Sequence, residues 1–307
     1  MICFRKSIIS RPISKVLPSL GVRNVSTQDR LEPYSKFEFF KVNKVADHVI
    51  QVEFSRPEAR NALPMKAWHE MREIFSRLNH DVHFRAAVLS GQGKMFSAGI
   101  DLSSFAEIAA YPSSDPSRKA LSYRKIIQDL QDCVKSLNVC AKPVIAAVHN
   151  GCIGAGVNIA GACDIRYCSQ DAYFQIKEVL VGLAADVGVL QFLSKSVGNH
   201  SLLRELVFTG RKFDCNEAKE LGLVNRVLSD QAKTIETAIQ TAKTIASISP
   251  VAVQGSKVNL NFSMNHSVDD GLAFIATWNA AMLQSEDTPK SVMAAASKGD
   301  PPTFDDL

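Results

Sequence analysis

The alternation of hydrophobic and polar residues predicts strands that are followed by helices. Residues Val49–Phe54 alternate with a period of two, which is typical of a strand, and Phe37–Val42 is a strand-like run before them. A polar turn, Arg56–Pro64, leads into a helix that ends near Asn79, in which large apolar residues recur at helical spacing: Trp68, Met71, Phe75 and Leu78. Continuous apolar runs predict buried strands at Arg85–Ser90 and Lys142–Val148. This order of elements indicates an α/β fold.

Beyond about Lys233 only helical patterns remain. They predict four helices: Ile235–Ile248, Val251–Leu260, Val268–Gln284 and Pro289–Ser297. We therefore divide the chain into an N-terminal segment at 1–28, an α/β core at 29–233 and a C-terminal helical region at 234–307. The apolar faces of that region have two possible partners, the core or a neighbouring subunit, and the sequence leaves both open.

One segment has the length of a membrane span. Pro143–Cys163 comprises 21 residues without Asp, Glu, Lys or Arg. Polar residues and glycines interrupt it, among them His149 and Asn158, so a strand (Val144–Val148), a glycine turn and a buried helix (Gly154–Cys163) explain it better. We expect no membrane insertion.

Composition adds little until the charge is divided along the chain. The chain has 307 residues, of which 46% are hydrophobic and 21% charged, which excludes collagen-like and disordered classes. The formal net charge is +4, but residues 1–28 carry five basic residues and no acid, so residues 29–307 carry a net charge of −1. The five are Arg5, Lys6, Arg11, Lys15 and Arg23. A near-neutral mature chain argues against nucleic acid as a partner.

The composition of residues 1–28 is typical of a mitochondrial transit peptide, because it is cationic, contains Ser and has scattered Ile, Val and Leu. The alternative is a basic tail without a targeting role. The chain ends in Asp305-Asp306-Leu307, which is not a peroxisomal signal of the SKL type. We therefore expect a protein of the mitochondrial matrix.

The cysteines and histidines do not form a recognisable site. The seven cysteines include no C-x-x-C pair, and no HExxH motif is present. We interpret Cys163 and Cys168 as small buried residues rather than a reactive pair. We expect no disulfide framework and no metal site.

Two glycine-marked turns are candidates for chemistry. FSAGIDL (Phe96–Leu102) and HNGCIGAGVN (His149–Asn158) each follow a predicted strand. In the second, Ala155 lies in the first turn of a helix, where its amide lacks a helical partner and the helix favours an anion. Two such amides converging on one point would form an oxyanion hole; tight structural turns are the alternative. The glycine order differs from the dinucleotide-binding G-x-G-x-x-G, and no Walker-type GK[ST] is present.

Two acids lie in an apolar stretch, KEVLVGLAADVG. Glu178 and Asp186 are surrounded there by Val, Leu and Ala. Apolar neighbours raise the pKa of a carboxyl group and suit it to acid–base catalysis. The alternative is a pair of solvated surface acids.

Taken together, these segments resemble the crotonase (enoyl-CoA hydratase/isomerase) superfamily. The resemblance covers roughly residues 37–300 and rests on RPEARNAL, FSAGIDL, GCIGAGVNIAGACDIRYCSQDAYFQIKEVLVGL and LVFTGRKFDCNEAKELGLVNRV. It implies a ββα-spiral core, a C-terminal helical trimerisation region, an acyl-CoA thioester substrate, no further cofactor, and a homotrimer or dimer of trimers. It also implies that the oxyanion amides are those of Ile100 and Ala155. At the position of Ala155 the family usually has glycine. The substrate-binding loop then comprises Ala98, Gly99, Ile100, Asp101 and Leu102.

Within this superfamily the acids distinguish the reactions. Hydratases have glutamates at the positions of Asn158 and Glu178, so an amide at the first position disfavours hydration. Glu178 with Asp186 resembles the family of delta(3,5)-delta(2,4)-dienoyl-CoA isomerases, which act in the oxidation of unsaturated fatty acids. The resemblance implies that Asp186 removes a proton from C2 and that Glu178 delivers one at C6. The aspartate usual in that family at the Asn158 position is missing.

Other functions remain as alternatives. The nearest are an enoyl-CoA hydratase and a delta3-delta2-enoyl-CoA isomerase. More distant ones are an RNA-binding protein of the same fold and a pseudoenzyme that retains only subunit contacts. An assay against a panel of enoyl- and dienoyl-CoAs distinguishes them.

Overall fold

A six-stranded sheet forms the centre of the computed structural model, which describes residues 31–109 and 115–307. The predicted targeting segment, residues 1–28, lies outside the described residues. The strand order is β1-β2-β3-β4-β6-β9, with β1 antiparallel to β2 and the other neighbours parallel. The strands are Phe40–Ala46 (β1), Val49–Phe54 (β2), Ala86–Gly91 (β3), Val144–Val148 (β4), Ile165–Ser169 (β6) and Arg226–Leu228 (β9).

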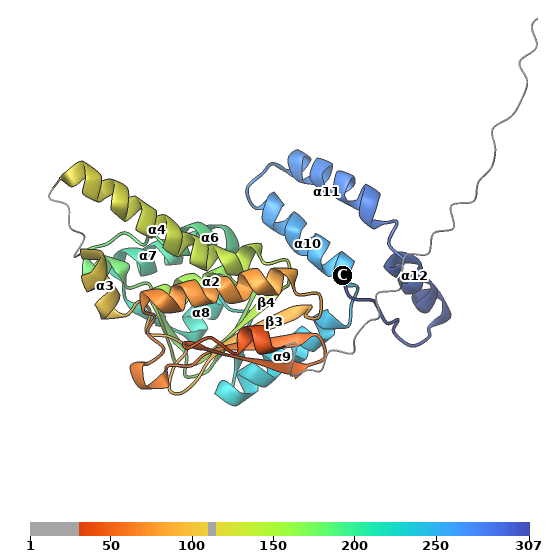
Figure 1. The fold of residues 1–307 in the computed structure, drawn as a ribbon, viewed down its shortest axis with the longest axis horizontal. Helices are drawn as coiled ribbons and strands as arrows, with labels where there is room; N and C mark the ends of the chain where they lie inside the picture. The colour runs from red at the N-terminus through yellow and green to blue at the C-terminus, as the bar shows by residue number, and fades with distance from the viewer. Residues whose placement is uncertain (1–30, 110–114) are drawn as a thin grey trace, which may run out of the picture.

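Helices cover both faces of this sheet, as parallel strands require. Successive residues of a strand point to opposite faces. Thus Leu89 of β3 belongs to the main hydrophobic core together with residues of α2 (Met65–His80), whereas Val88 belongs to a second cluster with α9 (Gln231–Ala246). Figure 1 shows α2 and α9 on opposite sides of the sheet.

A smaller sheet begins just after β4 and carries the segments that build the site. Its order is β5-β7-β8, and its strands are Gly151–Ile153, Tyr173–Gln175 and Lys212–Asp214. The helices of this region are α3 (Leu102–Ala109), α4 (Pro116–Val139), α5 (Ala155–Ala162), α6 (Val189–Ser196), α7 (His200–Thr209) and α8 (Cys215–Leu221). Short 3-10 turns are η1 (Glu32–Tyr34), η2 (Pro57–Ala59) and η3 (Glu178–Val181).

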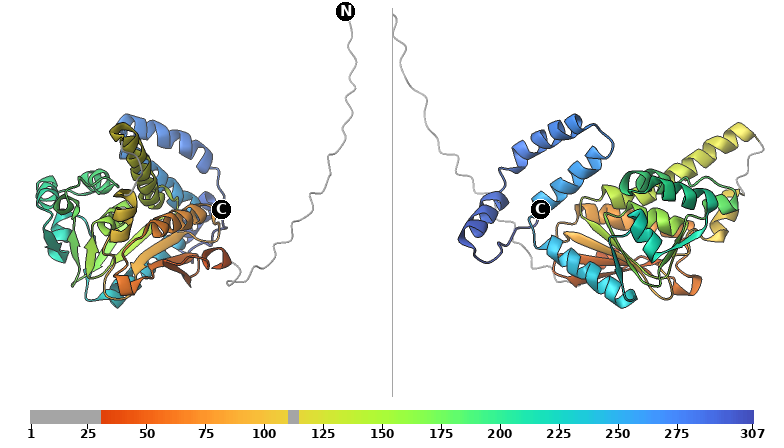
Figure 2. Two further views of the ribbon diagram at one scale, coloured as in Figure 1. Left: turned by 60° about the vertical axis from the view of Figure 1, so that its left-hand side comes forward. Right: turned by 180° about the vertical axis from the view of Figure 1, so that it is seen from behind.

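The last three helices stand apart from the sheet in Figure 1 and Figure 2. They are α10 (Pro250–Ser263), α11 (Val268–Met282) and α12 (Asp287–Ser297). Lys257 fastens α10 to the core, because its buried ammonium group pairs with Asp164 at 2.7 Å and donates to two backbone carbonyl groups, those of Leu137 and Lys142.

The predicted α/β fold with a C-terminal helical region is confirmed, and β2 has its predicted bounds. The first strand was predicted three residues early, at Phe37–Val42. The N–H groups of Glu38 and Phe39 donate instead to the carboxylate of Glu70, so pairing begins only at Phe40. In Pro143–Cys163 the predicted strand and buried helix are β4 and α5, and the predicted glycine turn contains the short strand β5. None of the described helices is long and apolar enough to cross a bilayer.

Candidate active site

A cavity of about 470 Å³ opens between the two glycine-marked turns and η3. Glu178 lines it, and so do all six residues for which the sequence predicted substrate binding: Ala98, Gly99, Ile100, Asp101, Leu102 and Ala155. Asp186 is not among the described residues that line this cavity. The fold therefore brings seven of the eight predicted residues to one cavity, although they lie on separate segments of the chain.

The first turn is held by hydrogen bonds to the chain before α2. The N–H of Leu63 donates to the carbonyl oxygen of Gly99 at 2.8 Å, and the N–H of Asp101 donates to that of Leu63 at 3.0 Å. Ala98 donates to the carbonyl oxygen of Arg60 at 2.9 Å. The N–H of Ile100 takes no part in these bonds and has no acceptor within the described residues.

Gly99 allows the two turns to touch. Its φ is +93°, a conformation that side chains disfavour, and a Cβ there would lie 2.7 Å from the carbonyl oxygen of Ile153 and 3.2 Å from the nitrogen of Ala155. Ala155 is the first residue of α5, and its N–H likewise has no acceptor in the described chain. The free amides of Ile100 and Ala155 thus lie on two turns in contact, an arrangement suited to binding a developing oxyanion.

Glu178 is the first residue of η3 and is held by one side chain. Its Oε1 accepts a hydrogen bond from Asn158 Nδ2 at 2.9 Å, whereas its buried Oε2 has no partner within the described chain. Burial raises the pKa of Glu178; the Asn158 hydrogen bond opposes this rise, and the nearby charge of Asp186 adds to it. A carboxyl group with a raised pKa keeps its proton to higher pH than an ordinary glutamate, which suits it to transferring that proton.

Asp186 lies between η3 and α6, close enough for its charge to affect Glu178. Its carbonyl oxygen accepts a hydrogen bond from Gln131 Nε2 of α4 at 2.7 Å. The residue as a whole is exposed in the single chain, yet partial burial of the carboxyl group raises its pKa. The structure therefore gives Glu178 and Asp186 different environments.

Asp101 lines the cavity, but its carboxylate already has partners in the protein. It accepts hydrogen bonds from the backbone N–H and the hydroxyl of Ser103 and pairs with Arg56, and these contacts lower the pKa of Asp101 to about 2. Its carboxylate therefore also links the start of α3 to Arg56, which precedes η2.

Several residues of the cavity escaped the sequence-based prediction. Two are cationic, Arg60 and Lys177, and others are apolar, including Phe105, Val181 and Leu183. Arg60 occurs within RPEARNAL, a turn that the sequence analysis noted. Its φ in the structure is positive, at 55°, which is unusual for a residue other than glycine. No pattern in the sequence places the others beside the glycine turns, because only the fold brings α3 and η3 together.

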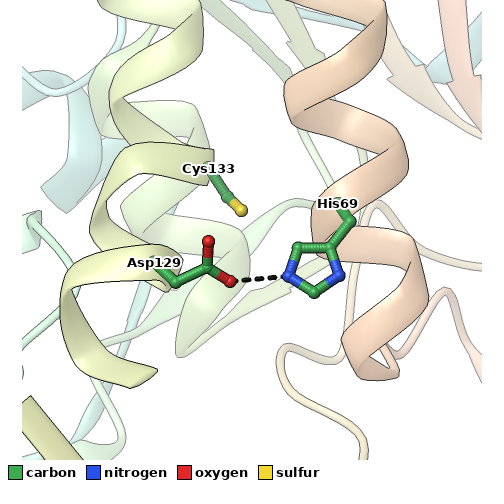
Figure 3. A group of neighbouring side chains, drawn as sticks. All are labelled: His69, Asp129 and Cys133. Atoms are coloured by element: carbon green, nitrogen blue, oxygen red, sulfur yellow. Dashed lines mark hydrogen bonds and ion pairs between the residues drawn. The ribbon is translucent and has the colours of Figure 1, made fainter. Parts of the chain in front are cut away.

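A second cluster, between α2 and α4, has a composition that metals can bind. His69, Asp129 and Cys133 offer ligand atoms within 4.8 Å of one another (Figure 3). Asp129 is already engaged, however: one oxygen bonds to Nε2 of His69 at 2.6 Å and the other to the guanidinium group of Arg72 at 2.5 Å. Burial also raises the pKa of the Cys133 thiol to about 12, so a fixed cation and a protonated thiol both oppose metal binding. We interpret the cluster as a link between two helices.

Comparison with curated proteins finds close relatives across most of the chain. The mitochondrial delta(3,5)-delta(2,4)-dienoyl-CoA isomerase of Rattus norvegicus is 50% identical over 86% of this chain and 81% of its own length. The human mitochondrial enzyme of that name is 49% identical, covering 85% and 80%. The peroxisomal one of Arabidopsis thaliana is 40% identical, covering 88% and 98%.

Solved structures share the fold. An enoyl-CoA hydratase from Mycobacterium smegmatis matches with a TM-score of 0.78 and 27% identity, over 87% of this chain and 99% of that chain. The family model described as enoyl-CoA hydratase/isomerase matches residues 44–306. The predicted crotonase-like α/β fold is thereby confirmed, and the chain belongs to the enoyl-CoA hydratase/isomerase family.

Proposed function

We propose that this chain is a delta(3,5)-delta(2,4)-dienoyl-CoA isomerase, which converts a 3,5-dienoyl-CoA to the 2,4-dienoyl-CoA. A relative with this name, from rat, is 50% identical to it over 86% of its length. The observation that carries the proposal is the carboxyl group of Glu178, which lines one cavity with the amides of Ile100 and Ala155. Asp186 is close enough for its charge to affect Glu178, and shifting two double bonds requires one proton to leave and another to be delivered. Asn158 stands where a hydratase has the first of its two glutamates and therefore disfavours the addition of water.

In the proposed reaction the thioester oxygen accepts hydrogen bonds from the N–H groups of Ile100 and Ala155. Asp186 takes a proton from C2, and the electrons of that C–H bond form the enolate, whose charge the two amides stabilise. Electrons then move outward along the chain: the C5=C6 pair takes the proton of Glu178 at C6, leaving double bonds at C2 and C4. Each amide of such a pair typically lowers the barrier by about 2.7–4 kcal/mol.

The test of this assignment is the variant Asp186→Asn, assayed by the absorbance of the conjugated product. Removing a catalytic acid–base group lowers the rate by about 10²–10⁴-fold, so we expect kcat to fall in that range. Turnover at the wild-type rate would exclude Asp186 as the base. A wild-type enzyme that hydrates 2-enoyl-CoA but leaves 3,5-dienoyl-CoA unchanged would exclude the isomerase in favour of the hydratase.

The location and assembly of the protein belong to the same proposal. Residues 1–28 have the composition of a mitochondrial transit peptide, and the relatives from rat and human are named as mitochondrial. For assembly we propose a homotrimer or a dimer of trimers formed through α10–α12, whose surface carries large exposed apolar residues: Leu260, Leu272, Leu283 and Val292. Import of a fusion of residues 1–28 to a reporter protein, and sedimentation of the mature chain, test the two statements.

A further inference from the structure

Asn158 is completely buried, and its side chain forms hydrogen bonds with three neighbouring residues. Its Nδ2 donates to the carbonyl oxygen of Gly154 at 3.0 Å and to Glu178 Oε1 at 2.9 Å. Its Oδ1 accepts the N–H of Val189 at 2.6 Å. Val189 is the first residue of α6, whose N–H lacks a partner within its own helix. One side chain therefore joins the start of α5, the start of η3 and the start of α6.

These contacts fix which way the amide points. The N–H of Val189 requires an oxygen, and the two other neighbours are both oxygen acceptors, so only Nδ2 can face Glu178. The donor is permanent, because an amide does not titrate. Glu178 Oε1 is therefore always an acceptor, and the only oxygen left to carry a proton is Oε2, which has no partner in the described chain.

We propose that Asn158 is a positioning residue that makes Oε2 the proton-bearing oxygen of Glu178 and stabilises the negative charge that Glu178 acquires when its proton leaves. A hydrogen bond to a carboxylate is stronger than one to a neutral acid, so the Asn158 donor contributes more after the transfer than before it. The inference rests on the proposed function, since it concerns the proton that Glu178 delivers.

Among the described side chains around Glu178, Asn158 is the one placed for this task, and the backbone N–H groups of Glu178 and Lys177 act in the same direction. The nearest acid is Asp186, whose charge disfavours the ionised form of Glu178. The charged groups that share the cavity with it are Arg60, Asp101 and Lys177, and Asp101 is engaged by Arg56. No described cation pairs with Glu178, so the amide of Asn158 is the side-chain donor that supports its carboxylate.

The decisive variant is Asn158→Asp, which keeps an oxygen for Val189 but turns the donor into a second carboxyl group. The two acids then share a proton, and the pair holds its last proton to higher pH. We expect the loss of activity at high pH to move upward by about one pH unit or more and KM to stay within about twofold. In 13C NMR the pKa of the Glu178 carboxyl, assigned by its disappearance in Glu178→Gln, should rise as well.

The matched control is Asn79→Asp, near the C-terminal end of α2. The side-chain oxygen of Asn79 also accepts a hydrogen bond from a backbone N–H, that of Ala141, at 2.8 Å. The control variant should leave the pH profile and the pKa of Glu178 unchanged. Asn158→Ala removes the donor without adding a charge, should shift the pKa in the same direction, and decides the matter if the Asp variant does not fold.

An unchanged pH profile and an unchanged Glu178 pKa in a folded variant of Asn158 would overturn the inference, even if kcat falls, because a purely structural role predicts that result. Failure of the proposed function has a different signature. In that case wild-type protein does not convert 3,5-dienoyl-CoA, while the NMR titration, which needs no turnover, still measures the effect of Asn158 on Glu178.

Discussion

Two inward-facing carboxyl groups of this protein have opposite surroundings. Asp164 precedes β6, and its Oδ2 receives both the ammonium group of Lys257 and the N–H of Val144, each at 2.7 Å. Glu178 has one oxygen bonded to the neutral amide of Asn158 and another without a partner. Asp164 has a full countercharge, whereas Glu178 has none.

The difference separates a structural acid from a chemical one. At Asp164 the ion pair with Lys257 stabilises the charged form against the cost of burial and fastens α10 to the core. Burial raises the pKa of both acids, but at Asp164 the positive charge of Lys257 opposes the rise, whereas at Glu178 the charge of Asp186 adds to it. The protein thus uses the same functional group for both purposes and distinguishes them by the groups placed around it.

The largest expected effect is on the chemistry of Glu178. In Glu178→Gln the amide oxygen can still accept the hydrogen bond from Asn158, but the side chain no longer carries an exchangeable acid proton. We expect kcat to fall by about 10²–10⁴-fold, while the melting temperature changes little. Steady-state assays with 3,5-dienoyl-CoA and thermal unfolding measure the two quantities. A large loss of stability with retained activity would reverse the assignment of Glu178 as the chemical acid.

The converse result is expected for Lys257→Met, which leaves Asp164 without its countercharge. Breaking a buried pair on one side typically costs about 3–5 kcal/mol in the free energy of unfolding. Urea unfolding at fixed protein concentration should show a loss near that range, with kcat of the folded fraction within about twofold of wild type. Replacing both partners, Lys257→Met with Asp164→Asn, should recover part of the loss. If the single variant is as stable as wild type, the pair does not fasten α10.

The sequence contained enough to predict the α/β fold, the two glycine turns and the acidic stretch, because each has a local pattern. It missed α4, whose first half is largely exposed and whose buried apolar residues gather near its end: Leu130, Cys133, Val134 and Leu137. The residue pattern by itself also could not separate Glu178 from Asp186, to which only the family resemblance gave different roles. Both lie in apolar sequence, and only the fold shows that Glu178 lines the cavity while Asp186 does not. Contacts between distant segments, such as Lys257 with Asp164, leave no local pattern at all.

The smallest effect is expected at a third carboxyl group, Asp129, which is paired but partly exposed. Its partners His69 and Arg72 are exposed to a similar extent, so water screens the attraction and such pairs typically contribute about 0–1 kcal/mol. Asp129→Asn should therefore lower the free energy of unfolding by less than about 1 kcal/mol and leave kcat unchanged. In a titration with Zn²⁺, the wild-type protein and this variant should behave alike, because we expect no 1:1 binding of the ion that depends on Asp129. Such binding, or a loss as large as that of Lys257→Met, would show that pairing and exposure alone do not rank these three acids.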